Sequence, residues 1–201
     1  MSSPLVSVLL PVRDAGPYLA ACLASLARQT LSDIEVVAVD DGSLDGSSEA
    51  LDGWSRTDSR IRVLHRQASG LVASLNAGLA ACRGEVVARM DADDVCHPRR
   101  LELQARLLAE RPELGAVSCL VRHFPRRAVG VGFRLYEEWL NALITPEAVA
   151  RERFVESPVA HPSAVLRREL LERLGGYREA GWPADYDLWL RLLESGGNHA
   201  A

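Results

Sequence analysis

Short aliphatic runs alternate with segments of helical periodicity over the first 122 residues. The runs are rich in Val, Leu and Ile and predict buried strands at 6–10, 34–39, 61–64, 86–90 and 116–121. The segments between them carry apolar residues three or four positions apart and predict helices at 15–29, 45 to about 55, 71–81 and 98–111. This strand–helix alternation is typical of a parallel α/β sheet covered by helices.

The pattern loosens after residue 122. Residues 124–132 fit an edge strand or a loop, 135–143 and 145–153 fit short helices, and the HPSAVL sequence within 158–166 indicates the start of another strand. Residues 167–174 and 185–195 predict two further helices, the second with one apolar face. We find no repeat, low-complexity tract or linker, and we expect a single domain over residues 1–201. The tail SGGNHAA predicts a frayed end, consistent with a C-terminally truncated chain.

Composition excludes several classes of function. The chain is 48% apolar and 25% charged with a formal net charge of −4, and all 23 basic residues are arginine. Without lysine, no side-chain Schiff base and no P-loop lysine is available. The arginines are scattered in a mildly acidic chain, which argues against a nucleic-acid partner.

The cysteines and apolar segments indicate the compartment. Cys22, Cys82, Cys96 and Cys119 have neither CxxC nor zinc-site spacing, and we expect buried free thiols in a reducing cytosol. The longest uncharged run, residues 67–82, is too short and polar to cross a bilayer. No basic segment precedes the first apolar run, so we expect no signal peptide. The predicted location is cytoplasmic, and peripheral association with the inner face of a membrane stays open.

Polar clusters follow three of the predicted strands: Arg13-Asp14, Asp40-Asp41 and Asp91 to Asp94. Ligands of parallel α/β sheets bind beyond the carboxyl ends of the strands. The Asp-x-Asp of ARMDADDV can hold a divalent cation against a diphosphate, although a charged turn before the next helix explains it equally well. The VDDGS carboxylates can bind a base or a ribose, and an Asp/Gly turn is the simpler interpretation.

A later acidic segment, PADYDLWLRLLE, contains Asp185 and Asp187. On a helix these two side chains point to different sides, so one can face a cleft. Asp185 can deprotonate an alcohol there, or it can simply cap the helix. His161 lies before this segment, and an isolated histidine is more often structural than catalytic.

The ordered motifs resemble the family 2 glycosyltransferases over nearly the whole chain. They are VSVLLPVRDAGPYL, VVAVDDGSLDGS, LNAGLAACRGEVVARMDADD, HPSAVLRRE, GGYRE and DYDLWLRLLE. The resemblance implies a GT-A fold, with a Rossmann-like, mostly parallel central sheet flanked by helices. Residues 1–122 would bind nucleotide sugar and metal, and 123–201 would form the acceptor side. The implied reaction is metal-dependent and inverting. It transfers a hexose-type sugar from a nucleotide sugar, usually a UDP-sugar, to a hydroxyl of a saccharide or lipid-linked acceptor in cell-envelope polysaccharide or glycolipid synthesis.

The resemblance also assigns residues. The nucleotide pocket would begin with Pro11, Val12, Arg13 and Asp14, while Asp40 and Asp41 would contact the base or ribose and Asn76 would join the donor-binding set. Asp91 and Asp93 would hold Mn²⁺ or Mg²⁺ against the diphosphate, with Asp91 also counted among the donor-binding residues. Asp185 would be the catalytic base, although Ala184 stands where members often carry Glu.

Two alternatives remain at this point. A domain of this kind could bind a sugar nucleotide without transferring the sugar, as Ala184 and the short tail suggest. Asp91 to Val95 also fit the DxDxV pattern of haloacid-dehalogenase-like phosphatases, with Asp91 as nucleophile. Those enzymes usually carry that motif on the first strand and use a later lysine or arginine, whereas here it follows the fourth predicted strand and lysine is absent.

Overall fold

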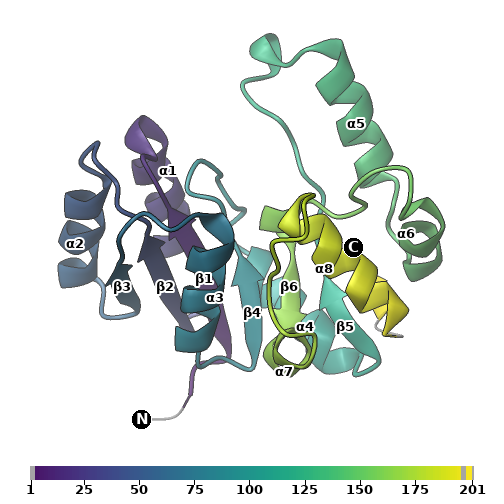
Figure 1. Ribbon diagram of the computed structural model, residues 1–201, viewed down its shortest axis with the longest axis horizontal. Coiled ribbons are helices and arrows are strands. Elements are labelled where there is room, and N and C mark those ends of the chain that lie inside the picture. The colour runs from purple at the N-terminus through teal and green to yellow at the C-terminus, as the bar shows by residue number, and fades with distance from the viewer. Residues whose placement is uncertain (1–2, 196–197, 201) are drawn as a thin grey trace.

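The computed structural model describes residues 3–195 and 198–200, which form a seven-stranded sheet in the order β3-β2-β1-β4-β6-β5-β7 (Figure 1). The strands are β1 (Val6–Val12), β2 (Ile34–Asp40), β3 (Ile61–His65), β4 (Val86–Arg89), β5 (Leu114–Val117), β6 (Val165–Arg167) and β7 (Asn198–Ala200). Among the described strands, only β6 runs antiparallel to its neighbours. The predicted mostly parallel α/β sheet is confirmed.

Strand β1 sits at the centre of the parallel part and is buried along its whole length, as is β2. Residues of parallel strands covered on both faces are almost continuously apolar, which explains the aliphatic runs. The register places Val12 opposite Asp40, and Asp40 opposite His65. The carboxyl ends of β1, β2 and β3 therefore meet at one edge of the sheet.

Helices cover both faces of the sheet. One apolar cluster joins β1 to α1 (Gly16–Ala27), α2 (Ser47–Thr57) and α4 (Arg100–Glu110). The opposite cluster joins β1 and β2 to α3 (Leu71–Ala81), α7 (Arg168–Arg173) and α8 (Ala184–Glu194). Helix α3 lies very close to the sheet, because a Cβ added at Gly78 would overlap the Leu9 side chain.

Between β5 and β6 the chain leaves the sheet and forms η1 (Arg126–Ala128), α5 (Val131–Asn141), α6 (Pro146–Glu152) and η2 (His161–Ser163). Helix α5 projects away from the body of the molecule (Figure 1). The strand predicted at 116–121 ends at Val117. The backbone N–H of Val121 donates a hydrogen bond to the Asn141 side chain at 2.9 Å, and the Val121 carbonyl accepts one from it at 2.8 Å. These backbone groups therefore do not pair with a neighbouring strand. The helix predicted from residue 135 begins at Val131.

Strand β6 lies between β4 and β5 and is antiparallel to both. It therefore brings the second part of the chain into the middle of the sheet. The division into residues 1–122 and 123–201 as donor and acceptor sides stays a proposal. Of the tail, residues 196–197 and 201 lie outside the described residues. Residues 198–200 pair in parallel with β5, so the expectation of fraying is wrong for them.

The prediction that the cysteines are free thiols is confirmed. All four are free thiols, three of them buried and Cys119 half-buried. Burial raises the pKa of Cys22 and of Cys82 to about 12, so both thiols are protonated and unreactive near neutral pH. No helix in the described part of the chain has the length and apolar character needed to cross a membrane.

Candidate functional site

A small cavity lies at the carboxyl edge of β1, β2 and β4. Its volume is about 150 Å³, and it is lined by Pro11, Val12, Arg13, Asp41, Gly70, Leu71, Ser74 and Asp91. Five of these were predicted donor-site residues: Pro11, Val12, Arg13, Asp41 and Asp91. Ligand pockets usually measure about 300–1,000 Å³. A nucleotide sugar would therefore place only part of itself in this cavity and extend over the rim.

Asp41 is the best-bonded carboxylate of the cavity. Its Oδ1 accepts hydrogen bonds from the backbone N–H of Ser69 at 2.8 Å and the Ser69 hydroxyl at 3.0 Å, and its Oδ2 accepts one from the Gly70 N–H at 2.9 Å. A longer contact of 3.4 Å joins Oδ2 to the Arg13 guanidinium. Burial alone would raise the pKa of Asp41, but these hydrogen bonds outweigh burial and lower it.

Ser74 gives the cavity an unused polar group. Its hydroxyl is buried and has no hydrogen-bond partner among the described residues, although it lies close enough to Asp41 to help lower that pKa. Buried hydroxyls normally have partners. An unpaired one in the wall of a cavity indicates a place where a polar ligand atom can bind.

Asp40 lies outside the cavity wall, unlike its neighbour. Its carboxylate accepts hydrogen bonds from Ser43 N–H at 3.0 Å and Ser48 Oγ at 2.5 Å, and it contacts Nδ1 of His65 at 3.0 Å. These bonds lower the pKa of Asp40 against the opposing effect of burial, while those from Asp40 and Asp52 raise the pKa of His65. The prediction named both aspartates, and the structure ties Asp40 into the turn before α2.

Asp14 and Asn76 are also outside the cavity wall. Asp14 has a left-handed backbone (φ 48°), and its carboxylate accepts the Leu44 N–H at 2.7 Å, which holds the loop after β2. Asn76 of α3 donates to the Tyr177 carbonyl and accepts from the Tyr177 N–H, both at 2.9 Å. The Asn76 side chain therefore fastens the loop between α7 and α8 onto α3.

The aspartates after β4 form a concentration of negative charge. Asp93 is exposed, Asp91 is partly exposed and Asp94 is half-buried. Burial raises the pKa of Asp94 to about 6, and the negative charges of Asp91 and Asp93 act in the same direction. In the described ranges, no three His, Cys, Asp or Glu side chains converge as a metal site. Mg²⁺ is often held by one or two carboxylates together with substrate phosphates, and Asp91 and Asp93 fit this mode.

Arg89, which the sequence prediction did not single out, contacts the cavity residue Asp91. Its side chain is 2% exposed, yet its guanidinium bonds the Met90 carbonyl and lies 2.5 Å from Oδ1 of Asp91. Its Nε has no partner among the described residues. The signal available in the sequence was an arginine inside a short apolar strand, directly before the Asp-x-Asp.

Asp185 lies in the first turn of α8 and is partly buried. The N-cap of this helix is Pro183, so Asp185 does not cap it. Within residues 3–195 no hydrogen bond ties the Asp185 carboxylate to another group. Asp187, in contrast, is buried and paired with Arg191 at 2.6 Å, and Arg191 also bonds the carbonyls of Leu174 and Gly176.

His161 lies in a packed cluster beneath this edge. Its Nε2 is 3.1 Å from the Tyr177 hydroxyl, and its ring packs against the rings of Tyr177 and Trp189. Burial, aided by the positive charge of Arg89, lowers the pKa of His161 well below its usual value, so the ring is neutral. Burial also raises the pKa of Tyr177, and the charges of Asp185 and Asp91 act in the same direction. Tyr177 therefore lies within the electrostatic influence of both aspartates.

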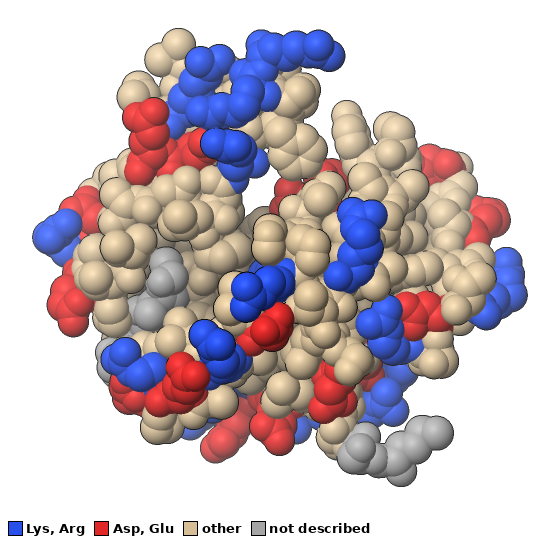
Figure 2. Space-filling model, turned by 180° about the vertical axis from the view of Figure 1, so that it is seen from behind, with Lys and Arg blue, Asp and Glu red and all other residues tan. Residues whose placement is uncertain are grey.

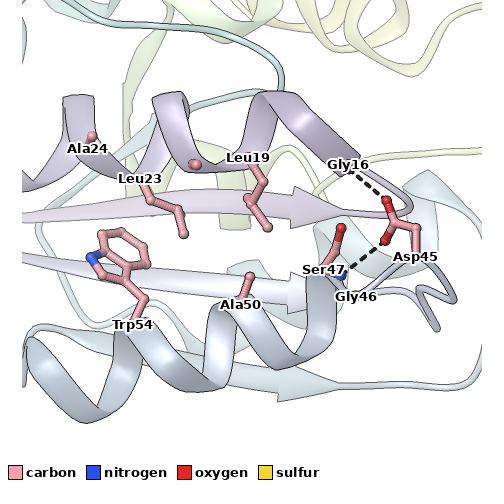
Figure 3. Close-up of a pocket in the computed structure, with 10 residues that line it drawn as sticks. Gly16, Leu19, Leu23, Ala24, Asp45, Gly46, Ser47, Ala50 and Trp54 are labelled. Carbon is pink, nitrogen blue, oxygen red and sulfur yellow. Dashed lines mark hydrogen bonds between the residues drawn. The ribbon is translucent and has the colours of Figure 1, made fainter.

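A larger cavity of about 470 Å³ lies between α1 and α2 (Figure 3). Its walls are mostly apolar, with Leu19, Leu23 and Trp54 facing inward. At one end Asp45 accepts the backbone N–H groups of Gly16 at 2.7 Å and Ser47 at 3.0 Å. None of the predicted site residues lines this cavity, so the smaller cavity, which five of them line, is the candidate site.

Comparison with known proteins identifies the family. Residues 7–175 match the family model described as Glycosyl transferase family 2. The chain belongs to this family. The prediction from the ordered motifs is confirmed, and the match supports a glycosyltransferase domain in place of the phosphatase alternative.

Two relatives are similar in sequence. The amylovoran biosynthesis glycosyltransferase AmsE of Erwinia amylovora is 32% identical over 196 residues, which are 96% of this chain and 71% of AmsE. The glycosyltransferase EpsJ of Bacillus subtilis is 38% identical over 116 residues, which are 58% of this chain and 33% of EpsJ. The match therefore covers about a third of EpsJ.

Solved glycosyltransferases have the same fold. The mannosyltransferase PcManGT of Pyrobaculum calidifontis, in complex with GDP-Man and Mn²⁺, has a TM-score of 0.77 and 27% identity; the match covers all of this chain and 55% of PcManGT. TarS of S. aureus, residues 1–349 with UDP-GlcNAc, has a TM-score of 0.77 at 20% identity, over 97% of this chain and 55% of that one. The predicted GT-A fold is confirmed, and the chain spans about half the length of these two structures.

The two aspartates of the Asp-x-Asp should affect folding differently. Asp91→Ala removes the one carboxylate paired with the buried Arg89 charge among the described residues, and we expect it to lower the free energy of unfolding by about 3 kcal/mol. Asp93→Ala removes an exposed side chain, with an expected change within about 0.5 kcal/mol. Urea denaturation in a metal-free buffer measures both values. Equal stability of the two variants would contradict the role given to the Arg89–Asp91 pair.

The Asp41 hydrogen bonds predict a pH-dependent effect. Asp41→Asn should lower the free energy of unfolding by about 1–3 kcal/mol at pH 7, because an amide cannot accept all of these bonds. Since the folded-state pKa of Asp41 lies below the ordinary 3.8, ionised Asp41 stabilises the fold above about pH 4, and this contribution is lost as the pH falls through the folded-state pKa. The difference in free energy of unfolding between the wild type and Asp41→Asn should therefore become smaller at acid pH.

Urea denaturation from pH 7 to pH 3 measures this difference. Asp33→Asn is the control, because Asp33 is exposed and its substitution should change stability by no more than about 0.5 kcal/mol. A wild-type-to-variant difference that stays constant down to pH 3 would show that ionisation of Asp41 does not contribute.

Proposed function

We propose that this chain transfers a sugar from a nucleotide-sugar donor to a hydroxyl group of an acceptor, with inversion at the anomeric carbon. The observation that carries the proposal is the cavity that joins Arg13, Asp41 and the unpaired Ser74 hydroxyl to Asp91, the first of the aspartates after β4. The binding of GDP-Man and Mn²⁺ by PcManGT, which is 27% identical, supports it.

The donor would bind with its base against Asp41 and Ser74. The Arg13 contact of Asp41, at 3.4 Å, is the longest of its hydrogen bonds, so a ring N–H of the base can most readily replace it. The Arg13 side chain is 54% exposed and can then turn toward the diphosphate. Ser74 would donate or accept a hydrogen bond at the base or ribose. Of the two predicted aspartates, this assigns base recognition to Asp41 and leaves Asp40 to hold the turn.

Asp91 and Asp93 would hold Mn²⁺ or Mg²⁺ together with the diphosphate oxygens. A bound divalent cation neutralises charge on the departing nucleoside diphosphate. Arg89 compensates part of the Asp91 charge and fixes its Oδ1, so Asp91 would offer mainly its other oxygen. Arg13 would add positive charge where negative charge develops on the leaving group.

Asp185 would act as the general base. Its carboxylate has no hydrogen bond within residues 3–195, and its charge acts on Tyr177 in the same direction as that of Asp91. It would take the proton of an acceptor hydroxyl as the oxygen attacks the anomeric carbon from the side opposite the diphosphate. This single displacement inverts the configuration, and general-base help of this kind contributes roughly 10²–10⁴-fold.

The substrates and the setting are proposals of the same kind. A UDP-sugar donor and a saccharide or lipid-linked acceptor in cell-envelope polysaccharide synthesis agree with the name of AmsE, which is 32% identical. The cysteines, all free and three of them buried, support the proposed cytoplasmic location. Ala184 in place of the usual Glu supports one alternative, a domain that binds a sugar nucleotide without transfer.

Replacement of Asp185 tests the reaction. Asp185→Asn should keep the affinity for the nucleotide sugar and lower turnover about 10²–10⁴-fold, because the amide cannot accept the proton. Donor affinity is measured by calorimetry and transfer by release of nucleoside diphosphate with an acceptor panel. Glu194→Gln, at the exposed far end of the same helix, is the matched control and should retain activity. Near-wild-type turnover of Asp185→Asn would remove the assignment of the base. Donor binding without turnover in the wild-type chain would favour the binding-only alternative.

A further inference from the structure

The projecting segment around η1 and α5 exposes many large apolar side chains. Eight such side chains between residues 120 and 155 are at least 55% exposed: Leu120, Phe124, Val131, Phe133, Leu135, Ile144, Phe154 and Val155. Phe124, Val131, Phe133 and Leu135 belong to one stretch at the outer end of the segment. We refer to residues 120–135 as the tip. Exposed apolar clusters of this kind usually mark a binding surface.

The charge of the tip has a single sign. No Asp or Glu occurs between Glu113 and Glu137, although the whole chain carries a net charge of −4. Four arginines lie in this interval: Arg122, Arg126, Arg127 and Arg134. In the space-filling view, basic side chains gather on the protruding end of the molecule (Figure 2).

Internal hydrogen bonds fix the conformation of the tip, and they bury the carboxylate nearest to it, that of Glu137. Glu137 is 6% exposed and accepts bonds from the His123 N–H at 2.6 Å and Arg126 Nη1 at 2.7 Å. Arg134 donates to the carbonyls of Val129 and Arg126. Arg122 and Arg127 are exposed, and neither has an ion-pair partner among the described residues. The outer surface of the tip therefore offers aromatic and aliphatic groups between positive charges.

We propose that the tip docks on the surface of an anionic lipid bilayer. Apolar side chains flanked by arginines can enter the boundary between headgroups and acyl chains while the guanidinium groups bind lipid phosphates. A second copy of this chain fits the tip poorly, because face-to-face contact would bring two groups of arginines together. The proposal extends the proposed function, since a docked tip would hold the acceptor side of the enzyme at a membrane that carries lipid-linked acceptors.

Vesicle flotation of the whole chain tests the docking. The probes are vesicles of phosphatidylcholine alone and vesicles containing 30% phosphatidylglycerol. We expect binding to the anionic vesicles, binding at least about tenfold weaker to the neutral ones, and weakening in high salt. Arg122→Glu/Arg127→Glu and Phe124→Ser/Phe133→Ser should each weaken binding by about tenfold or more.

The control is Arg106→Glu/Arg173→Glu, which makes the same change of charge on exposed arginines of α4 and α7 and should bind like the wild type. Far-ultraviolet circular dichroism and nucleotide binding confirm that each variant is folded. No binding to anionic vesicles, or equal losses in the tip and control variants, would overturn the proposal. A wild-type dimer in solution that the Phe variant dissociates would instead assign the tip to a contact between copies. Vesicle binding without any sugar transfer would count against the proposed function and leave the docking proposal standing.

Discussion

A positive charge at the end of β4, the guanidinium of Arg89, is buried in the middle of the molecule and has to be compensated there. Compensation comes from the Met90 carbonyl and from Asp91, which is 36% exposed at the edge of the sheet. The same charge helps to keep the half-buried His161 neutral. Through His161 it is linked to Tyr177, whose backbone Asn76 ties to α3. A single ion pair thus connects the core with the site.

The predicted site residues have different parts in this arrangement. Asp40, Asp14 and Asn76 hold the loops that surround the cavity, and Asp41 both holds the chain before α3 and lines the cavity. The carboxylates of Asp93 and Asp185 have no hydrogen bond or ion pair among the described residues, which suits groups that would bind a cation and accept a proton. The rigid parts of the edge are therefore built from bonded carboxylates, and the groups left for chemistry stand at its rim.

Much of the fold follows from the sequence because buried parallel strands need continuous aliphatic runs. Both bounds of α3 agree with the prediction, and β1 to β4 lie where their runs predict them. The start of α5 was missed because Gly132 disfavours a helix, and the end of β5 because the Asn141 bonds to Val121 are long-range. For the same reason the sequence could not distinguish Asp41 from Asp40. Their different roles depend on Ser69, Gly70 and His65, which only the folded chain brings near. Arg89 was overlooked because its partner and its burial are likewise properties of the fold.

The central claim is that the cavity and the aspartates after β4 form one donor site that needs a divalent cation. Calorimetric titration of UDP into the wild-type chain and into Asp93→Ala, with Mn²⁺ and after chelation, tests it most directly. We predict that the wild type binds UDP much more tightly with Mn²⁺ than without, and that Asp93→Ala loses this difference while its folding stability is preserved. Equal affinity of the wild type with and without the cation, or an unchanged Mn²⁺ effect in Asp93→Ala, would contradict the account.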